Sequence, residues 1–167
     1  NGEGFRLVNP RNSGDICGAQ LLLPKPVELQ MGNEILPVTP DIVFTTNNTN
    51  SDILLNALKR THEITFPFRN NKGKSLSWPG VLVVNVVHPE EHLHLFVDES
   101  YELTVTREMA IINAKTVLGA LHALNTFSQL VKYDYHTQLY SLGCAPILIR
   151  DKPRFAWRGL LIDSSRH

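Results

Sequence analysis

The chain has 167 residues, of which 43% are hydrophobic and 19% are charged, and this length and composition favour one folded globular domain over a disordered chain. Its 16 basic residues balance its 16 acidic residues, so no bulk charge attracts nucleic acid or an anionic membrane surface. No apolar run reaches the ~18 residues that span a bilayer. We therefore expect no nucleic-acid partner and no membrane span.

The amino-terminal part of the sequence predicts an extended arm followed by short strands. Residues 1–26 are rich in glycine, asparagine and proline, and Pro24-Lys25-Pro26 imposes an extended backbone. Three β-leaning segments follow, at residues 27–31, 35–38 and 42–45. Gly32-Asn33, between the first two segments, resembles a hairpin turn. The pattern indicates an antiparallel ribbon.

The next segments predict a helix and a central strand. Ser51 is a suitable amino-terminal cap for a helix over residues 52–62, with Ile53, Leu54, Ala57 and Leu58 on one face. Residues 67–80 are polar and rich in turn formers, which is typical of a loop. Residues 81–87 are apolar on both faces, and this pattern favours a strand in the middle of its sheet.

Strands and a second helix alternate in the remaining sequence. Residues 101–105 alternate with a period of two, and residues 110–112 and 147–149 are short apolar strands. Apolar residues from 115 to 131 repeat at helical spacing, with a start near Asn113. Gly119 lies inside this helix, which indicates a close approach to another backbone. Gly159 to Asp163 is a final apolar strand with no following partner, and such a strand requires cover.

Motifs for metal or nucleophilic chemistry are incomplete. His62-Glu63 lacks the second histidine of a zinc-protease helix because Phe66 occupies that position. The stretch from His88 to His92 matches the inverted motif by letter, but Pro89 breaks the helix that the motif needs. His92 and His94 have no third ligand at suitable spacing. We expect no metal, no cofactor and no self-contained active site.

Two features are typical of the secretory route. Asn47-Asn48-Thr49 is an N-glycosylation sequon in a polar stretch, with Asn47 as the acceptor. Cys17 and Cys144 fit neither a metal site nor a redox motif, and a disulfide between them is compatible with an oxidising compartment. The spacing alone leaves the paired and the free thiol forms open.

Two stretches carry a family resemblance: Tyr101 to Val105 leading through the helix to Thr126-Phe127-Ser128-Gln129-Leu130, and Pro153 to His167. Together they resemble the family 20 glycoside hydrolases, the β-N-acetylhexosaminidases, especially the eukaryotic lysosomal type. The resemblance implies an α+β domain, with an antiparallel or mixed sheet and two helices on one face. It also implies that the first strand of a (β/α)₈ barrel follows, with the rest of the barrel absent from these residues. The expected division is an entry arm at 1–26, the α+β domain at 27–152 and the start of the barrel at 153–167.

The resemblance also implies roles for individual residues. Arg166 matches the arginine that binds hydroxyl groups of the terminal N-acetylhexosamine, a task that suits the fixed donor fork of a guanidinium. Arg158 and Asp163 belong to the same motif and are expected to be structural, pairing at the barrel and the domain junction. Phe155 and Trp157 are expected to pack between domains rather than to stack on sugar.

Family members hydrolyse terminal β-linked N-acetylglucosamine or N-acetylgalactosamine with retention, by substrate-assisted catalysis. Their Asp-Glu pair comes from later barrel strands, so this chain alone has no catalytic residue and is expected to be inactive. Its expected partners are its own barrel and, through that barrel, glycans, in a lysosomal or secreted protein; homo-oligomer formation stays open. The alternative is a free-standing carbohydrate-binding or scaffold domain of the same fold.

Overall fold

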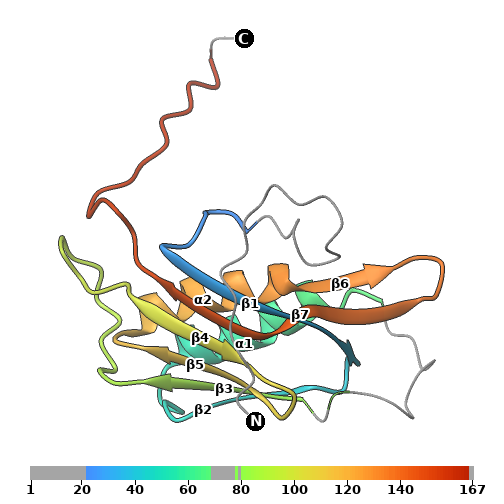
Figure 1. Cartoon of the computed structure of the whole chain (residues 1–167). Helices are drawn as coiled ribbons and strands as arrows, with labels where there is room; N and C mark the ends of the chain where they lie inside the picture. Colours follow the sequence, from blue (N-terminus) through green and yellow to red (C-terminus); the bar gives the residue numbers. More distant parts are fainter. Residues whose placement is uncertain (1–21, 69–77, 79, 166–167) are drawn as a thin grey trace.

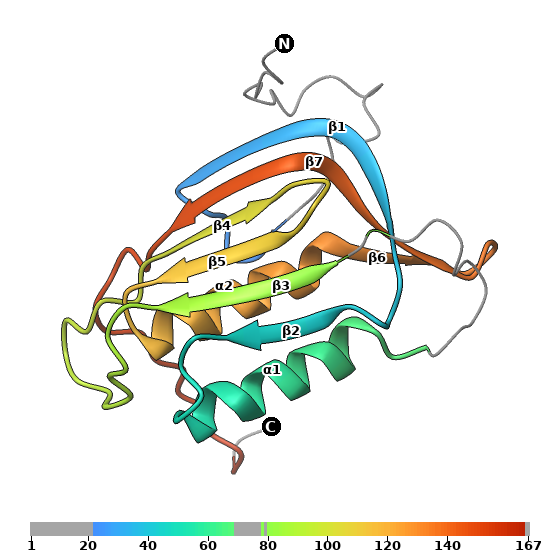
Figure 2. The same ribbon diagram turned by 90° about the horizontal axis from the view of Figure 1, so that it is seen from below.

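The computed structural model describes residues 22–68, 78 and 80–165, and within them a seven-stranded sheet is covered by two helices. The strands are β1 (Glu28–Val38), β2 (Val43–Thr46), β3 (Val81–Val86), β4 (Tyr101–Val105), β5 (Ala110–Ala114), β6 (Val131–Asp134) and β7 (Leu139–Asp151). The helices are α1 (Asp52–Thr65) and α2 (Val117–Leu130). Both helices lie on the same face of the sheet (Figures 1 and 2), so the predicted α+β architecture is confirmed.

The sheet is mixed, with strand order β1-β7-β4-β5-β3-β2 and β6 paired to β7. Strands β2, β3 and β5 run parallel, whereas β5, β4, β7 and β1 pair antiparallel. The predicted antiparallel ribbon is wrong for residues 42–45, because β2 pairs with β3 in parallel. Helix α1 lies between these two strands in sequence and provides the crossover that a parallel pair needs.

Strand β1 is continuous, so the predicted hairpin at Gly32-Asn33 is wrong. The strand follows β7 from Glu28 to Val38, with register shifts between Met31 and Leu36. A Cβ atom at Gly32 would lie 2.2 Å from the carbonyl oxygen of Ala145. The glycine therefore allows a close backbone approach at an irregularity of the strand pair, which is the other common use of glycine in strands.

Both helices begin at the side chain of a capping residue. The Leu54 amide donates to Ser51 Oγ at 3.0 Å, which confirms the predicted cap of α1. Ile53, expected on the buried face with Leu54, is instead 45% exposed. Helix α2 is capped by Thr116 and not near Asn113, because Asn113 still belongs to strand β5.

The core lies between the helices and the inner face of the sheet. Strand β3 runs between β2 and β5, which confirms its predicted central place. Alternate residues of β3, β4 and β5 are buried against the helices, as strand geometry requires. The largest fully buried side chains include Leu54, Leu82, Leu103, Ile112 and Phe127.

Strands β6 and β7 form a hairpin that extends beyond the helices (Figure 1). Residue Val131, expected to end the second helix, begins β6, and β7 is longer than the predicted strand at 147–149. Gln138, in the turn, has φ 60°, and the Asp134 side chain accepts hydrogen bonds from His136 and Thr137. Local turn chemistry of this kind favours an Asp at that place.

Residues after β7 leave the sheet as an extended segment, coloured red in Figure 1. Gly159 to Asp163 pairs with no strand within the described part of the chain. Leu160, Leu161 and Ile162 are 85%, 95% and 74% exposed. The assignment of these residues to a barrel strand therefore stays a prediction. Neither described helix has the length and apolar character needed to cross a membrane.

Candidate functional site

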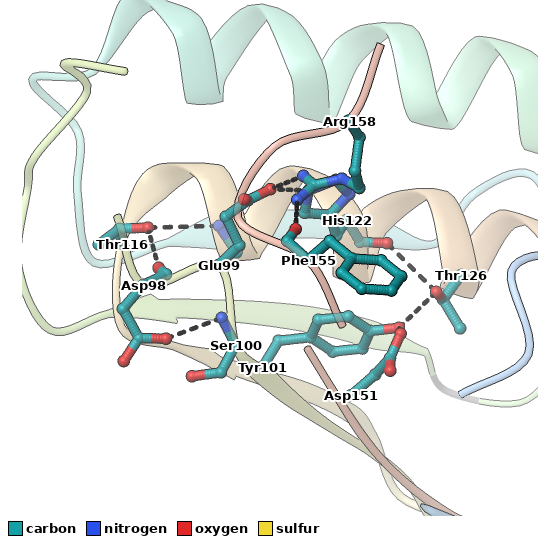
Figure 3. A network of polar contacts seen from close by, with 11 residues as sticks. Asp98, Glu99, Ser100, Tyr101, Thr116, His122, Thr126, Asp151, Phe155 and Arg158 are labelled. Carbon is teal, nitrogen blue, oxygen red and sulfur yellow. Dashed lines mark hydrogen bonds and ion pairs between the residues drawn. The ribbon is translucent and has the colours of Figure 1, made fainter. Parts of the chain in front are cut away.

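A network of polar contacts joins the α+β domain to the segment that leaves it. Its residues come from the loop before β4 and the start of that strand, from α2 and its cap, and from the end of β7 and the segment that follows it. Figure 3 shows that Arg158 turns back from the departing segment toward Glu99 and His122. The network lies where the chain passes from the domain to the residues that resemble a barrel strand.

Glu99 is the centre of this network. Its Oε2 atom lies 2.5 Å from Arg158 Nη2 and 2.6 Å from His122 Nε2, and its side chain is only 10% exposed. Burial by itself raises the pKa of the Glu99 carboxyl, but hydrogen bonds from Arg158 and His122 outweigh it and lower that pKa below its ordinary value. Glu99 therefore carries a negative charge at neutral pH and holds two donors from separate elements.

Arg158 also stabilises the conformation of its own segment. Its Nη1 atom donates to the carbonyl oxygen of Phe155 at 2.6 Å, which closes a turn just before the motif strand. The guanidinium of Arg154 lies over the Phe155 ring, 5.3 Å from its centroid. Phe155 and Trp157 are 62% and 80% exposed. The expected packing of these two aromatic residues between domains stays a prediction.

The loop that carries Glu99 is held against the start of α2. Thr116 Oγ donates to the carbonyl oxygen of Asp98 at 2.7 Å and accepts from the Gly119 amide at 3.4 Å. A Cβ atom at Gly119 would lie 2.6 Å from the carbonyl oxygen of Ser100. The predicted close approach at Gly119 is thus confirmed, and its partner is the backbone that precedes β4.

Tyr101 and Asp151 fix the end of β7 beneath this loop. The Tyr101 hydroxyl lies 2.6 Å from Thr126 Oγ on α2 and 3.4 Å from Asp151 Oδ2. Burial, with the nearby charge of Asp151, raises the pKa of Tyr101 to about 12, although the Thr126 contact opposes the shift. Asp151 also accepts from the Val27 amide at 3.1 Å, so the start of β1 is tied to the same point.

This arrangement is suited to holding a chain segment rather than to catalysis. The Glu99 carboxylate is ionised and already accepts two hydrogen bonds, so it is a poor general acid at neutral pH. No group of three or more metal-ligating side chains occurs within residues 22–68, 78 and 80–165. The network therefore fixes the position of Arg158 and, with it, the direction in which the chain leaves the sheet.

The predicted site residues fall at separate places. Arg166 and Cys17 lie outside the described residues. Asn47 follows β2, and its side chain accepts from the Val86 amide at 2.9 Å and donates to the Val86 carbonyl at 3.2 Å. Cys144 is 2% exposed, and no cysteine within the described part of the chain is free. The glycan, the Cys17 partner and the sugar-binding role of Arg166 stay predictions.

The histidines of the incomplete metal motifs have local partners. His62 Nε2 lies 2.9 Å from the carbonyl oxygen of Pro40, and its ring packs against Phe44 and Phe66. His94 Nε2 lies 3.1 Å from Glu90 in an exposed loop. These contacts give His62 a structural role, whereas His94 faces solvent.

The family motif implies that Arg158 and Asp163 pair at the domain junction, whereas the carboxylate that Arg158 contacts in the structure is that of Glu99. Glu99 precedes Arg158 by 59 residues, and nothing in the local pattern pairs them. His122 is one of several polar residues of α2, so it gives no specific signal either. Asp163, from the same motif as Arg158, accepts instead from Ser165 within its own turn.

The fold and the polar network around Glu99 define an α+β domain that holds the segment after β7 in place. Residues 22–130 match a family model described as beta-acetyl hexosaminidase like. The chain is 41% identical over 165 residues to Beta-hexosaminidase 1 of Arabidopsis thaliana, covering 87% of this chain and 30% of that protein. It is 32% identical over 154 residues to Beta-hexosaminidase subunit A1 of Dictyostelium discoideum, covering 91% of this chain and 29% of that protein. The chain belongs to the family 20 glycoside hydrolases and matches their amino-terminal, β-hexosaminidase-like domain.

Solved structures show the same fold. The chitobiase of Flavobacterium johnsoniae superimposes with a TM-score of 0.69 at 25% identity, over 89% of this chain and 23% of that one. The exo-β-N-acetylglucosaminidase of Vibrio harveyi, in complex with N-acetylglucosamine, gives a TM-score of 0.57 at 22% identity, over 89% of this chain and 20% of that one. The chain thus spans less than a third of the proteins it matches.

Proposed function

We propose that this chain is the non-catalytic amino-terminal domain of a retaining β-N-acetylhexosaminidase and that it supports a (β/α)₈ barrel. The whole enzyme would remove terminal β-linked N-acetylglucosamine or N-acetylgalactosamine, with the substrate's acetamido group as nucleophile. The catalytic Asp-Glu pair would come from the barrel, so these 167 residues would not turn over substrate by themselves.

The observation that carries this proposal is the anchoring of Arg158 by Glu99 immediately before an uncovered apolar run. The anchor holds the departing segment beside α2, and Leu160, Leu161 and Ile162 then lie mostly exposed. Three consecutive apolar residues in an extended segment favour pairing within another sheet. The first strand of a barrel would meet that need, because barrel strands are buried on both sides.

The other predicted residues have consistent places in this proposal. Arg166 would lie at the carboxyl end of that first strand, the face on which barrel enzymes build their active sites. There its guanidinium would donate to hydroxyl groups of the terminal sugar. The sequon at Asn47 and the pairing of Cys17 with Cys144 would suit a lysosomal or secreted enzyme.

The second candidate is a free-standing carbohydrate-binding or scaffold domain. A groove at one end of the sheet, with apolar surface and a few polar groups, favours a binding role of some kind, but the uncovered run at 160–162 disfavours a domain that stands alone. The two candidates differ in the sequence that each requires after His167. An enzyme requires roughly 250 further residues with an acidic pair on a later strand.

The deciding experiment is to determine the coding sequence beyond the codon for His167. The proposal expects an open frame that supplies the rest of the barrel and its Asp-Glu pair. A stop codon directly after His167 would contradict it and leave the binding domain as the better explanation.

A further inference from the structure

The sheet carries a groove of about 450 Å³ at the end from which the chain departs. Its polar lining includes Ser100, Glu102, Asn113, Lys115, Arg150 and Lys152. Glu102 and Asn113 alternate along their strands with residues buried against the helices. Glu102 and Asn113 therefore point to the face of the sheet opposite α1 and α2, and the groove reaches from there to Tyr101 and Asp151 of the polar network described above.

A row of paired polar side chains crosses the sheet, and three of its members, Glu102, Asn113 and Arg150, line the groove. Strand register places Glu28 opposite Arg150, Arg150 opposite Glu102, and Glu102 opposite Asn113. Arg150 donates to Glu102 at 2.7 Å and to Glu28 at 3.3 Å, and Asn85 Nδ2 donates to Asn113 Oδ1 at 3.0 Å. Each side chain is thus oriented by its neighbour before any ligand arrives, which lowers the entropy cost of binding.

These contacts leave donors and acceptors side by side. Both bonds from Arg150 end on Oε2 atoms, so Glu102 keeps Oε1 as an acceptor. Within the described part of the chain, the Asn113 amide group donates to no acceptor. A hydroxyl group both donates and accepts, so two neighbouring hydroxyls can bond to Glu102 and Asn113 together.

The charges around the groove favour a neutral ligand. Arg150 is compensated by Glu28 and Glu102. Hydrogen bonds from Ser100 lower the pKa of Asp98, and the charges of Lys115 and Lys152 lower it further. Val27 and Val87 add exposed apolar surface to the lining. The carboxylates of this groove would repel an anion, and its basic groups would repel a cation.

We infer that this groove is a binding site for a neutral pyranose sugar. Its volume lies within the range of small-molecule sites. Polyhydroxyl ligands match the alternation of oriented acceptor and donor groups, and the apolar walls suit the carbon face of a sugar ring. The site lies within this domain and does not depend on the proposed hydrolase activity.

The test is an amide ¹H–¹⁵N NMR titration of the 167-residue chain with N-acetylglucosamine, galactose and mannose, and separately with inorganic phosphate. We expect at least one sugar to cause saturable shifts at Ser100, Glu102, Asn113 and Lys115. E102Q and N113A should each weaken that binding about tenfold, because E102Q replaces one of the two acceptor oxygens with a donor and N113A removes the amide group.

The matched control is T104A, which changes the next outward-facing residue of β4 and lies outside the groove lining. It should bind the sugar as the unaltered chain does. Absence of saturable shifts with all three sugars, saturable shifts with phosphate alone, or sugar binding by E102Q and N113A as tight as that of the unaltered chain would each overturn the inference. None of these outcomes bears on whether a barrel follows His167.

Discussion

Arg158 and Glu99 are 59 residues apart in sequence, yet the guanidinium of one lies 2.5 Å from the carboxylate of the other. His122 of α2 bonds to the same carboxylate oxygen. The contact therefore links three parts of the chain: the loop before β4, helix α2 and the departing segment. It explains how a small domain sets the starting direction of the polypeptide that follows.

Loss of the Glu99 charge should release the departing segment. In E99Q, cleavage by trypsin after Arg158 should be about two to five times faster, because an ion pair of a partly exposed arginine contributes less than about 1 kcal/mol. Mass spectrometry of timed digests measures the rate. Cleavage after Arg107, which bonds to Glu34 instead, is the internal control and should not change. Equal rates after Arg158 in both proteins would show that Glu99 does not restrain it.

The same contact should be sensitive to acid. The pKa of Glu99 is lowered from an ordinary value of 4.5. Its stabilisation is therefore complete above about pH 4.5 and is lost as the pH falls through the lower pKa of the folded state. The difference in melting temperature between the unaltered chain and E99Q should stay constant from neutral pH to about 5 and shrink below about 4. Both proteins are compared in an H122N background, which removes the histidine. A difference that grows on acidification would contradict this sign.

Gly119 should not tolerate a side chain. Alanine favours a helix over glycine by about 1 kcal/mol, but its Cβ would lie 2.6 Å from the Ser100 carbonyl oxygen. We expect G119A to lower the free energy of unfolding by roughly 1–3 kcal/mol, measured with urea. G143A is the control, because a Cβ at Gly143 meets no atom within 4 Å. A stabilised G119A would mean that α2 does not press on the loop that carries Glu99.

Asn47 connects the end of β2 to Val86 through both atoms of its amide group. N47A should lower stability by about 1–3 kcal/mol, since it leaves the Val86 groups without these partners. T49A removes the sequon and keeps the amide, so it should have no such effect on protein that carries no glycan. Peptide mass spectrometry after expression through the secretory route tests whether Asn47 carries a glycan. Equal losses of stability in N47A and T49A would contradict the bridging role.

Elements with local signals are the ones that the sequence predicts correctly. Ser51 caps α1 as expected, and the apolar run at 81–86 forms a central strand. The prediction at Gly32 is wrong because a glycine needed for close approach and a glycine needed for a turn look alike in sequence. Strand β6 is not predicted because Val131 continues the apolar spacing of α2 before the backbone becomes extended.

The candidate site is less accessible to sequence reasoning. A family motif places Arg158 at the junction, but Glu99 and His122 come from other elements. Only the folded sheet brings them together, since their contact depends on how α2 crosses the loop before β4. The groove residues likewise meet through strand register, because Glu102 and Arg150 are 48 residues apart.

A domain that supports catalysis without performing it should be inactive by itself. The decisive assay is hydrolysis of an aryl N-acetyl-β-glucosaminide by the 167-residue chain and by the protein extended through its complete reading frame. We expect turnover by the extended protein alone, and loss of most of that activity when Arg166 is replaced by alanine. Turnover by the 167-residue chain itself would contradict the supporting role, because the catalytic residues would then lie within this domain.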